Sequence, residues 1–89
     1  MSITRVVIPS VESRYTTGYI ANVFRKLNIA EVRNITLTTN SYQSNIAYVD
    51  IEEWADTEVA YNIIRRLKEN KKEVRVVHKG DDWWVLRTN

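Results

Sequence analysis

The chain has 89 residues, of which 44% are hydrophobic and 27% charged, and its formal net charge is +2. A chain of this length forms one domain around one core, so we treat residues 1–89 as a single domain. The absence of cysteine excludes disulfides, thiolate metal sites and thiol nucleophiles. No apolar run approaches the roughly 18 residues of a membrane span, and the N-terminus lacks a signal-peptide pattern. We therefore expect an intracellular protein, cytoplasmic or nuclear, without a membrane partner.

The first two predicted elements are a strand and a helix. Residues 3–8 alternate in polarity and are rich in β-branched side chains, which predicts a strand. Pro9 is expected to close it, because proline cannot donate to a ladder. Apolar residues with the i, i+3, i+4, i+7 spacing between 20 and 27 then predict an amphipathic helix, capped by Thr16 or Thr17.

Two strands and a second helix follow. The uneven apolar spacing within residues 31–39 predicts a strand with a bulge. Residues 46–51 predict a strand in which Ala47, Val49 and Ile51 point to one face and Ile46, Tyr48 and Asp50 to the other. Asp56 or Thr57 is expected to cap a helix with an apolar stripe over residues 60–67.

The last predicted elements are strands over residues 73–79 and Trp83–Thr88, joined by a Gly-Asp-Asp turn. The order strand, helix, strand, strand, helix, strand predicts two right-handed crossovers that interleave into a four-stranded antiparallel sheet, with both helices on one face. The expected fold class is therefore α+β, a ferredoxin-like sandwich with Trp83–Thr88 as an extra C-terminal strand. Because both helices cover the same face, the opposite face is left open.

Two segments carry a resemblance to a known family. Val6–Val11 (VVIPSV) and Ser44–Ile51 (SNIAYVDI) stand where RNA recognition motif (RRM) domains have their two ribonucleoprotein motifs. The chain resembles an RRM over essentially its whole length. This resemblance implies that bases stack on outward side chains at the positions of Val7, Ile46 and Tyr48, of which only Tyr48 is aromatic.

A narrower resemblance concerns the tryptophans. Ile8-Pro9, Trp54 and Trp83-Trp84 are similar to residues in small, uncharacterised RRM-like proteins encoded mainly by large double-stranded DNA viruses. This resemblance implies a viral source and the same fold, and it implies no activity. From the residues themselves, Trp54 is expected to plug the entrance of the second helix and Trp84 to pack in the core.

The leading interpretation is a non-enzymatic RRM-like module that binds single-stranded RNA or other nucleic acid through the open sheet face. Stacking contributes about 1 to 3 kcal/mol per base, so the loss of two aromatic positions predicts weak binding. Tyr48 is expected to stack. The other expected contacts on or near this face are Val7, Ile46, Arg5, Asn34, Thr36, Arg75 and Lys79.

An interpretation of a different class is a protein-interaction or homodimer interface, because exposed aliphatic side chains favour protein contacts over base stacking. The residues expected in such an interface are Val7, Ile46, Tyr48, Trp83 and Val85. The pattern leaves open whether the C-terminal strand covers the open face or lies at its edge. The pattern also does not decide whether Trp83 packs in the core or contacts a partner.

The sequence predicts no catalytic residue, cofactor or metal. His78, the single histidine, reads as a half-exposed strand residue, and the acidic residues within 50–58 fit helix capping better than a calcium loop. The basic residues within 65–79 either complement the helix dipole or form a functional patch. Gly18 and Gly80 are too far apart for a phosphate loop.

Overall fold

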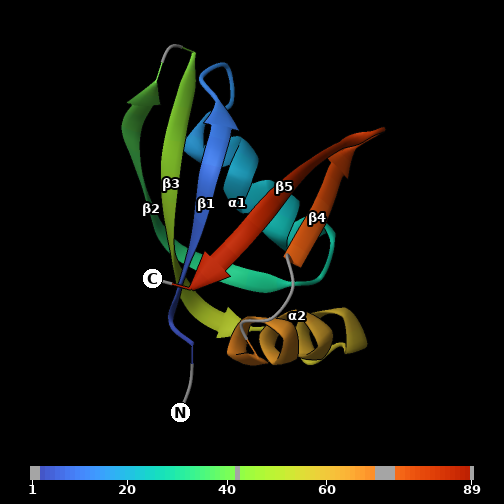
Figure 1. Cartoon of the computed structure of the whole chain (residues 1–89). Helices are drawn as coiled ribbons and strands as arrows, with labels where there is room; N and C mark the ends of the chain where they lie inside the picture. The colour runs from blue at the N-terminus through green and yellow to red at the C-terminus, as the bar shows by residue number, and fades with distance from the viewer. Residues whose placement is uncertain (1–2, 42, 70–73, 89) are drawn as a thin grey trace.

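The computed structural model describes residues 3–41, 43–69 and 74–88. The expected order of strands and helices is present, and a fifth strand follows it (Figure 1). Within the described residues, neither helix is long and apolar enough to cross a membrane. The elements are β1 (Arg5–Glu12), α1 (Thr17–Lys26), β2 (Ala30–Ser41), β3 (Ser44–Trp54), α2 (Glu58–Glu69), β4 (Val74–Lys79) and β5 (Asp82–Thr88).

All five strands belong to one antiparallel sheet with the order β2-β3-β1-β5-β4. The expectation of a four-stranded sheet is therefore wrong in number. The C-terminal strand β5 enters the sheet between β1 and β4, where it pairs with β1 through Val6↔Thr88 and Val7↔Arg87. Above this short junction β5 diverges from β1 (Figure 1). We call β1–β3 the three-strand half of the sheet and β4–β5 the hairpin half.

The expected second crossover is also wrong. β1 is antiparallel to both β3 and β5, and β4 is antiparallel to β5, so β3 and β4 run in opposite directions. The physical reason is the tight β4–β5 hairpin: Gly80 adopts a φ of 54°, which favours glycine in the turn. This hairpin brings Trp84 and Leu86 back onto the core, where both are buried.

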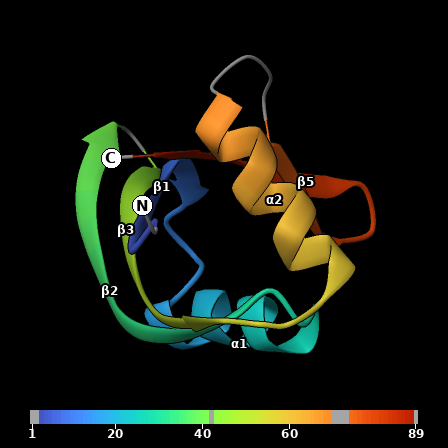
Figure 2. The same cartoon turned by 90° about the horizontal axis from the view of Figure 1, so that it is seen from below.

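The helices share a single hydrophobic core on one face of the sheet. Because buried residues of both helices and of the inward strand positions form one cluster, the expectation that the helices lie on the same face is confirmed. Seen from below, the curved strands and the two helices surround this common interior (Figure 2). The core residues include Val6, Ile8, Val11, Ile20, Phe24, Ala47, Val49, Ile51, Ile63, Leu67, Val76, Trp84 and Leu86.

β1 does not end at Pro9, contrary to the sequence-based prediction. It continues to Glu12, and its pairing with β3 shifts by one residue between Ile8 and Val11. Such a bulge accommodates a proline, which cannot donate to the ladder, and still buries Val11. The bulge predicted in the second strand is confirmed by register shifts on either side of Val32.

Threonine hydroxyls start both helices, as predicted. The Thr16 Oγ1 accepts a hydrogen bond from the Tyr19 amide at 3.1 Å. The Thr57 Oγ1 accepts from the Ala60 amide at 3.2 Å and donates to the Asn28 carbonyl at 2.7 Å. This second hydroxyl therefore ties the start of α2 to the end of α1.

Two predicted apolar contacts have different outcomes. Trp54 packs against the core, and its Nε1 donates to the Ile3 carbonyl at 2.7 Å, which fixes the N-terminal segment. Leu27 was expected on the buried stripe of the first helix, but its side chain is 38% exposed. The reason is that α1 ends at Lys26 and the chain turns at Asn28, whose φ is 57°.

Candidate nucleic-acid interface

The side of the sheet opposite the helices, which we call the open face, is organised by the strand register. Thr36 lies opposite Tyr48, Tyr48 opposite Val7, and Val7 opposite Arg87. These four side chains form one row across β2, β3, β1 and β5. Tyr48 and Val7 are half-buried, and Thr36 and Arg87 are exposed. The row therefore offers one aromatic ring with an apolar neighbour and a cation.

The adjacent rows flank this central one. Asn34 lies opposite Asp50 and Asp50 opposite Arg5, while Ile46 is half-buried on the other side of Tyr48. The Arg5 Nε donates to the Asp50 Oδ1 at 2.6 Å. This hydrogen bond holds the pKa of Asp50 below its usual value and raises the pKa of Arg5. The charge of Arg5 is thus partly compensated before any ligand arrives.

The hairpin half adds a second aromatic ring to the same face. Trp83, Val85 and Arg87 alternate along β5 with the buried Trp84 and Leu86, so they point to the open face. The Trp83 side chain is 44% exposed. The C-terminal strand therefore extends the open face instead of covering it.

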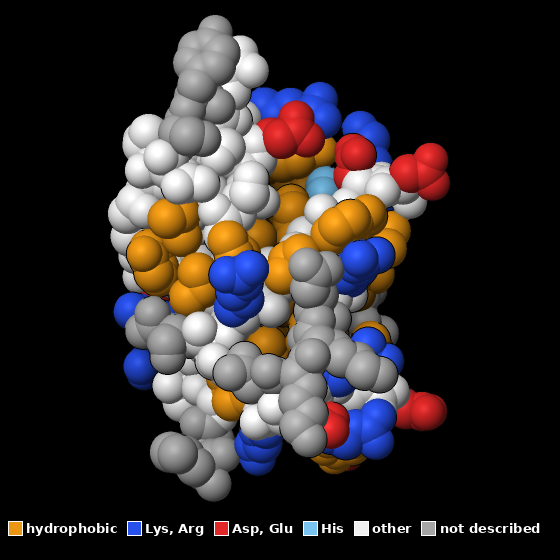
Figure 3. Space-filling model, in the orientation of Figure 1, with side chains coloured by type: hydrophobic (Ala, Val, Ile, Leu, Met, Phe, Trp, Pro, Cys, Tyr) orange, Lys and Arg blue, Asp and Glu red, His pale blue; other side chains and the backbone are white. Residues whose placement is uncertain are grey.

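The cations of the hairpin half lie near this ring. The Arg75 guanidinium carbon lies 4.4 Å from the centroid of the Trp83 ring, in a cation–π contact. Lys79 is exposed at the end of β4. Figure 3 shows hydrophobic and basic side chains over both halves of this face, whereas acidic side chains are visible mainly near the upper end of β1 and the β4–β5 turn. The face as a whole thus favours an anionic ligand that also offers apolar surface.

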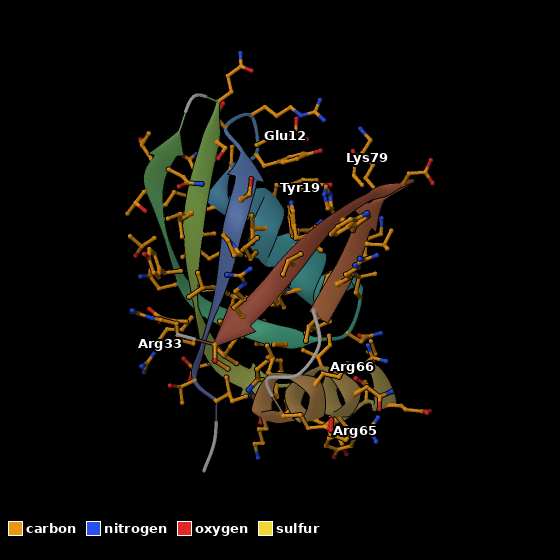
Figure 4. All side chains as sticks on the ribbon, in the orientation of Figure 1. Glu12, Tyr19, Arg33, Arg65, Arg66 and Lys79 are labelled. Carbon is orange, nitrogen blue, oxygen red and sulfur yellow. The ribbon has the colours of Figure 1, made fainter. Side chains whose placement is uncertain are left out.

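An aromatic cluster, consisting of Tyr15, Tyr19, His78 and Trp84, occupies the region where β1 and β5 diverge. The His78 ring stacks on the Trp84 ring, with centroids 4.0 Å apart, and its Nδ1 lies 3.0 Å from the Tyr19 hydroxyl. Tyr15 stacks on Tyr19 with centroids 4.6 Å apart. Figure 4 shows Tyr19 between the two strands, and Figure 3 shows the histidine within the hollow above them.

This cluster changes the interpretation of His78. The residue is half-buried, as the sequence indicated, but it is not an isolated strand residue, because it contacts two tyrosines and a tryptophan. Burial lowers the pKa of His78, so its neutral form is favoured in the folded protein. The cluster joins the hairpin half to α1 and to the turn that precedes this helix, in the region where β1 and β5 have diverged.

The structure brings most of the predicted contacts onto one surface, and it adds residues that the sequence reasoning missed. Arg87 lies beside Val7, and Trp83, predicted only for a protein contact, shares the open face with Tyr48. The alternation of β5 could have revealed Arg87, since it follows Trp83 and Val85 at the same spacing. Comparison of the chain with protein-family models, curated proteins and solved structures gave no match.

Proposed function

We propose that this protein is a non-enzymatic module that binds single-stranded nucleic acid, in the first place RNA, through the open face. The observation that carries the proposal is the presence of two outward aromatic rings, Tyr48 and Trp83, with cations beside them on a sheet face that no helix covers. We regard the sheet as an RRM-like sheet in which β5 takes the place beside β1.

Tyr48 is the base-stacking residue of the three-strand half. Its ring lies in the central row with Val7 on one side, so a base stacked on the ring also contacts an aliphatic side chain. The Arg5 guanidinium carbon lies 5.9 Å from the centroid of the same ring. Arg5 can contact a phosphate when the phosphate competes with Asp50 for its guanidinium. Stacking on one aromatic side chain contributes about 1 to 3 kcal/mol.

Trp83 extends the binding path into the hairpin half, and Arg87 lies in the row of Tyr48 and on the same strand as Trp83. Among the described residues, Arg87 and Lys79 form no ion pair with an acid. Both side chains are therefore available to phosphates. Because the net charge is only +2 and few cations can reach phosphates, we expect modest affinity that decreases with salt along a shallow slope.

The test is a fluorescence-anisotropy titration of mixed-sequence single-stranded RNA at low salt, with Tyr48→Ala and Arg87→Ala. Tyr61→Ala is the matched control for the tyrosine, because Tyr61 is exposed on α2, away from the open face. We expect Tyr48→Ala to weaken binding about fivefold to 150-fold, the equivalent of 1 to 3 kcal/mol. An absence of binding at low salt, or equal affinity of the Tyr48 and Tyr61 variants, contradicts the proposal.

A second candidate function is docking of a protein, or of a second copy, on the same face. It is favoured by the exposure of Val77, which is 55%, next to the exposed Trp83. Exposed apolar groups of this kind are typical of protein contacts. A molecular mass that rises with concentration in light scattering, and that Val77→Lys returns to the monomer value, would favour this candidate over nucleic-acid binding.

A further inference from the structure

A groove separates α2 from the outermost strand of the sheet, β4. Its volume is about 350 Å³, and none of the described residues that line it is acidic. One wall consists of Val59, Asn62, Ile63 and Arg66, which have the spacing of one helix face. The segment after α1 contributes Leu27 and Ile29, and the opposite wall is β4 itself.

The manner in which β4 lines this groove identifies what can bind there. The lining includes the four consecutive residues from Val74 to Val77. Side chains of consecutive strand residues point to opposite faces, so a run of four indicates that the groove follows the edge of the strand. β4 is the last strand of the sheet, with β5 as its one neighbour, and an edge strand presents backbone N–H and C=O groups on its outer side.

The groove therefore combines two features of a strand-addition site. Along one side it offers backbone groups that can pair with an extended peptide. Along the other it offers aliphatic side chains that are partly exposed in the free protein: Leu27 is 38% and Val59 is 43% exposed. A peptide strand laid against β4 would cover these side chains with its own apolar ones.

The charges define the chemistry of that peptide. Arg66 lies in the last turn of α2, on the side of the helix that faces β4 (Figure 4), and Arg75 lies on β4. The Arg75 guanidinium lies over the Trp83 ring, so Arg66 is the main cation of the groove, and the described lining residues include no carboxylate. The groove therefore favours acidic groups. The same arginines disfavour a second copy, because an antiparallel pairing of two β4 edges would bring like charges together.

We propose that this groove docks an extended, acidic segment of a partner protein as an additional strand on β4, with its apolar side chains in the groove and its carboxylates toward the arginines. Nucleic acid is a poorer occupant, since the described lining residues include no aromatic ring for stacking and a nucleotide chain cannot continue the backbone ladder. The site shares Arg75 and Val77 with the hairpin part of the open face, but its helix wall lies off that face, and the proposal goes beyond the nucleic-acid function proposed above.

The probe is a seven-residue peptide in which Glu and Val alternate, titrated to millimolar concentration into the isotope-labelled full chain while amide chemical shifts are followed. We expect saturable shifts at Val74–Val77 and along the Val59–Arg66 face of α2. The Lys-Val counterpart peptide tests the charge, and a Glu-Val peptide with a central proline tests the ladder, because proline removes a donor. Both are expected to bind at least about tenfold more weakly, which corresponds to about 1.4 kcal/mol.

Two variants of the protein complete the test. Arg66→Glu is expected to weaken binding of the acidic peptide about tenfold. Arg65→Glu is the matched control, because it makes the same change in net charge one residue away, at a position that does not line the groove. The Arg65 guanidinium donates to the Asn62 Oδ1, so this variant is expected to weaken binding clearly less than Arg66→Glu does. Val59→Asp removes part of the apolar wall at the start of the helix, where an acid is tolerated, and is expected to weaken binding.

Several results would overturn the proposal. They are an absence of shifts at millimolar peptide, shifts confined to the open face, equal binding of the acidic and basic peptides, and equal effects of the Arg66 and Arg65 variants. Shifts at β4 that appear on concentrating the protein alone would assign the edge to a second copy. Shifts along the Val59–Arg66 face of α2 with single-stranded RNA would assign the groove to nucleic acid, because that wall is not part of the open face. RNA binding at Tyr48 tests the proposed function of the open face, and its presence or absence neither supports nor contradicts the peptide groove.

Discussion

The two halves of the sheet are joined to the molecule in different ways. In the three-strand half, β3 pairs with both β1 and β2 over most of its length. Within residues 74–88, the hairpin half pairs with β1 at two positions, Val6↔Thr88 and Val7↔Arg87, and side chains such as Trp84 provide its other contacts with the core. The comparison teaches that backbone hydrogen bonds hold the three-strand half together, whereas aromatic packing holds the hairpin half to the rest of the protein. The two halves nevertheless share one open face.

The strongest test of this comparison is removal of Trp84. Its ring is buried, stacks on His78 and contacts both tyrosines of the aromatic cluster. Trp84→Ala is expected to lower the free energy of unfolding by about 3–5 kcal/mol, as large-to-small core changes do. Chemical denaturation measures this. Trp83→Ala, in the neighbouring exposed position, is the control and should cost less than about 1 kcal/mol.

Nucleic-acid affinity tests whether both halves belong to one interface. If the ligand crosses from the three-strand half to the hairpin, Trp83→Ala should weaken RNA binding about fivefold to 150-fold, as expected for Tyr48→Ala. The measurement is the anisotropy titration described above. Loss of affinity in the Tyr48 variant alone would restrict the interface to the three-strand half.

Acidification should affect the hairpin half through His78. Its pKa in the folded protein lies below the unfolded value of about 6.5 because the ring is buried, so protonation favours unfolding. Above about pH 6.5 the protonation of His78 should not reduce the free energy of unfolding. As the pH drops from there toward the lower folded pKa, the free energy of unfolding should decrease. Below the folded pKa, His78 should cause no further decrease. The charged and titratable groups around it are Glu12, Arg14, Tyr15, Tyr19, Lys79 and Asp82.

Denaturation at several pH values checks this dependence. His78→Phe keeps an aromatic ring against Trp84 but cannot titrate, so the difference between its stability and that of the original protein isolates the histidine. The difference should change between about pH 6.5 and the folded pKa. A pH-independent difference across that range would show that the cluster does not resist protonation.

The smallest effect is expected at the Arg5–Asp50 pair of the three-strand half. Asp50→Asn releases Arg5 and removes an acid from the open face, so RNA binding at low salt should become about two- to fivefold tighter. Stability should hardly change, because the pair is partly exposed. Glu31→Gln, which makes the same charge change in the Arg25 pair, is the control and should leave affinity unaltered.

Much of the three-strand half follows from local sequence patterns. The alternation in β3 correctly assigned Ala47, Val49 and Ile51 to the core. Threonines, whose hydroxyls accept hydrogen bonds from backbone amides of the first turn, marked both helix starts. The continuation of β1 beyond Pro9 was not predictable in this way. It depends on pairing with β3, which buries Val11 and accommodates the proline in a bulge.

The arrangement of the hairpin half could not be predicted, because it depends on contacts between residues far apart in the chain. Alternation correctly separated Trp84 and Leu86 from Trp83 and Val85, but it does not specify the neighbouring strand. Alternation therefore could not show that β5 inserts between β1 and β4. The environment of His78 likewise depends on Tyr19, 59 positions away.

The junction between β1 and β5 also has a consequence for synthesis of the protein. β1 leaves the ribosome well before its partner residues Arg87 and Thr88, which follow more than seventy positions later. Until then one edge of β1 has no strand beside it, and closing so long a loop is slow. The nascent chain therefore exposes this edge until β5 emerges, and interruption of translation before β5 would leave an intermediate prone to aggregation.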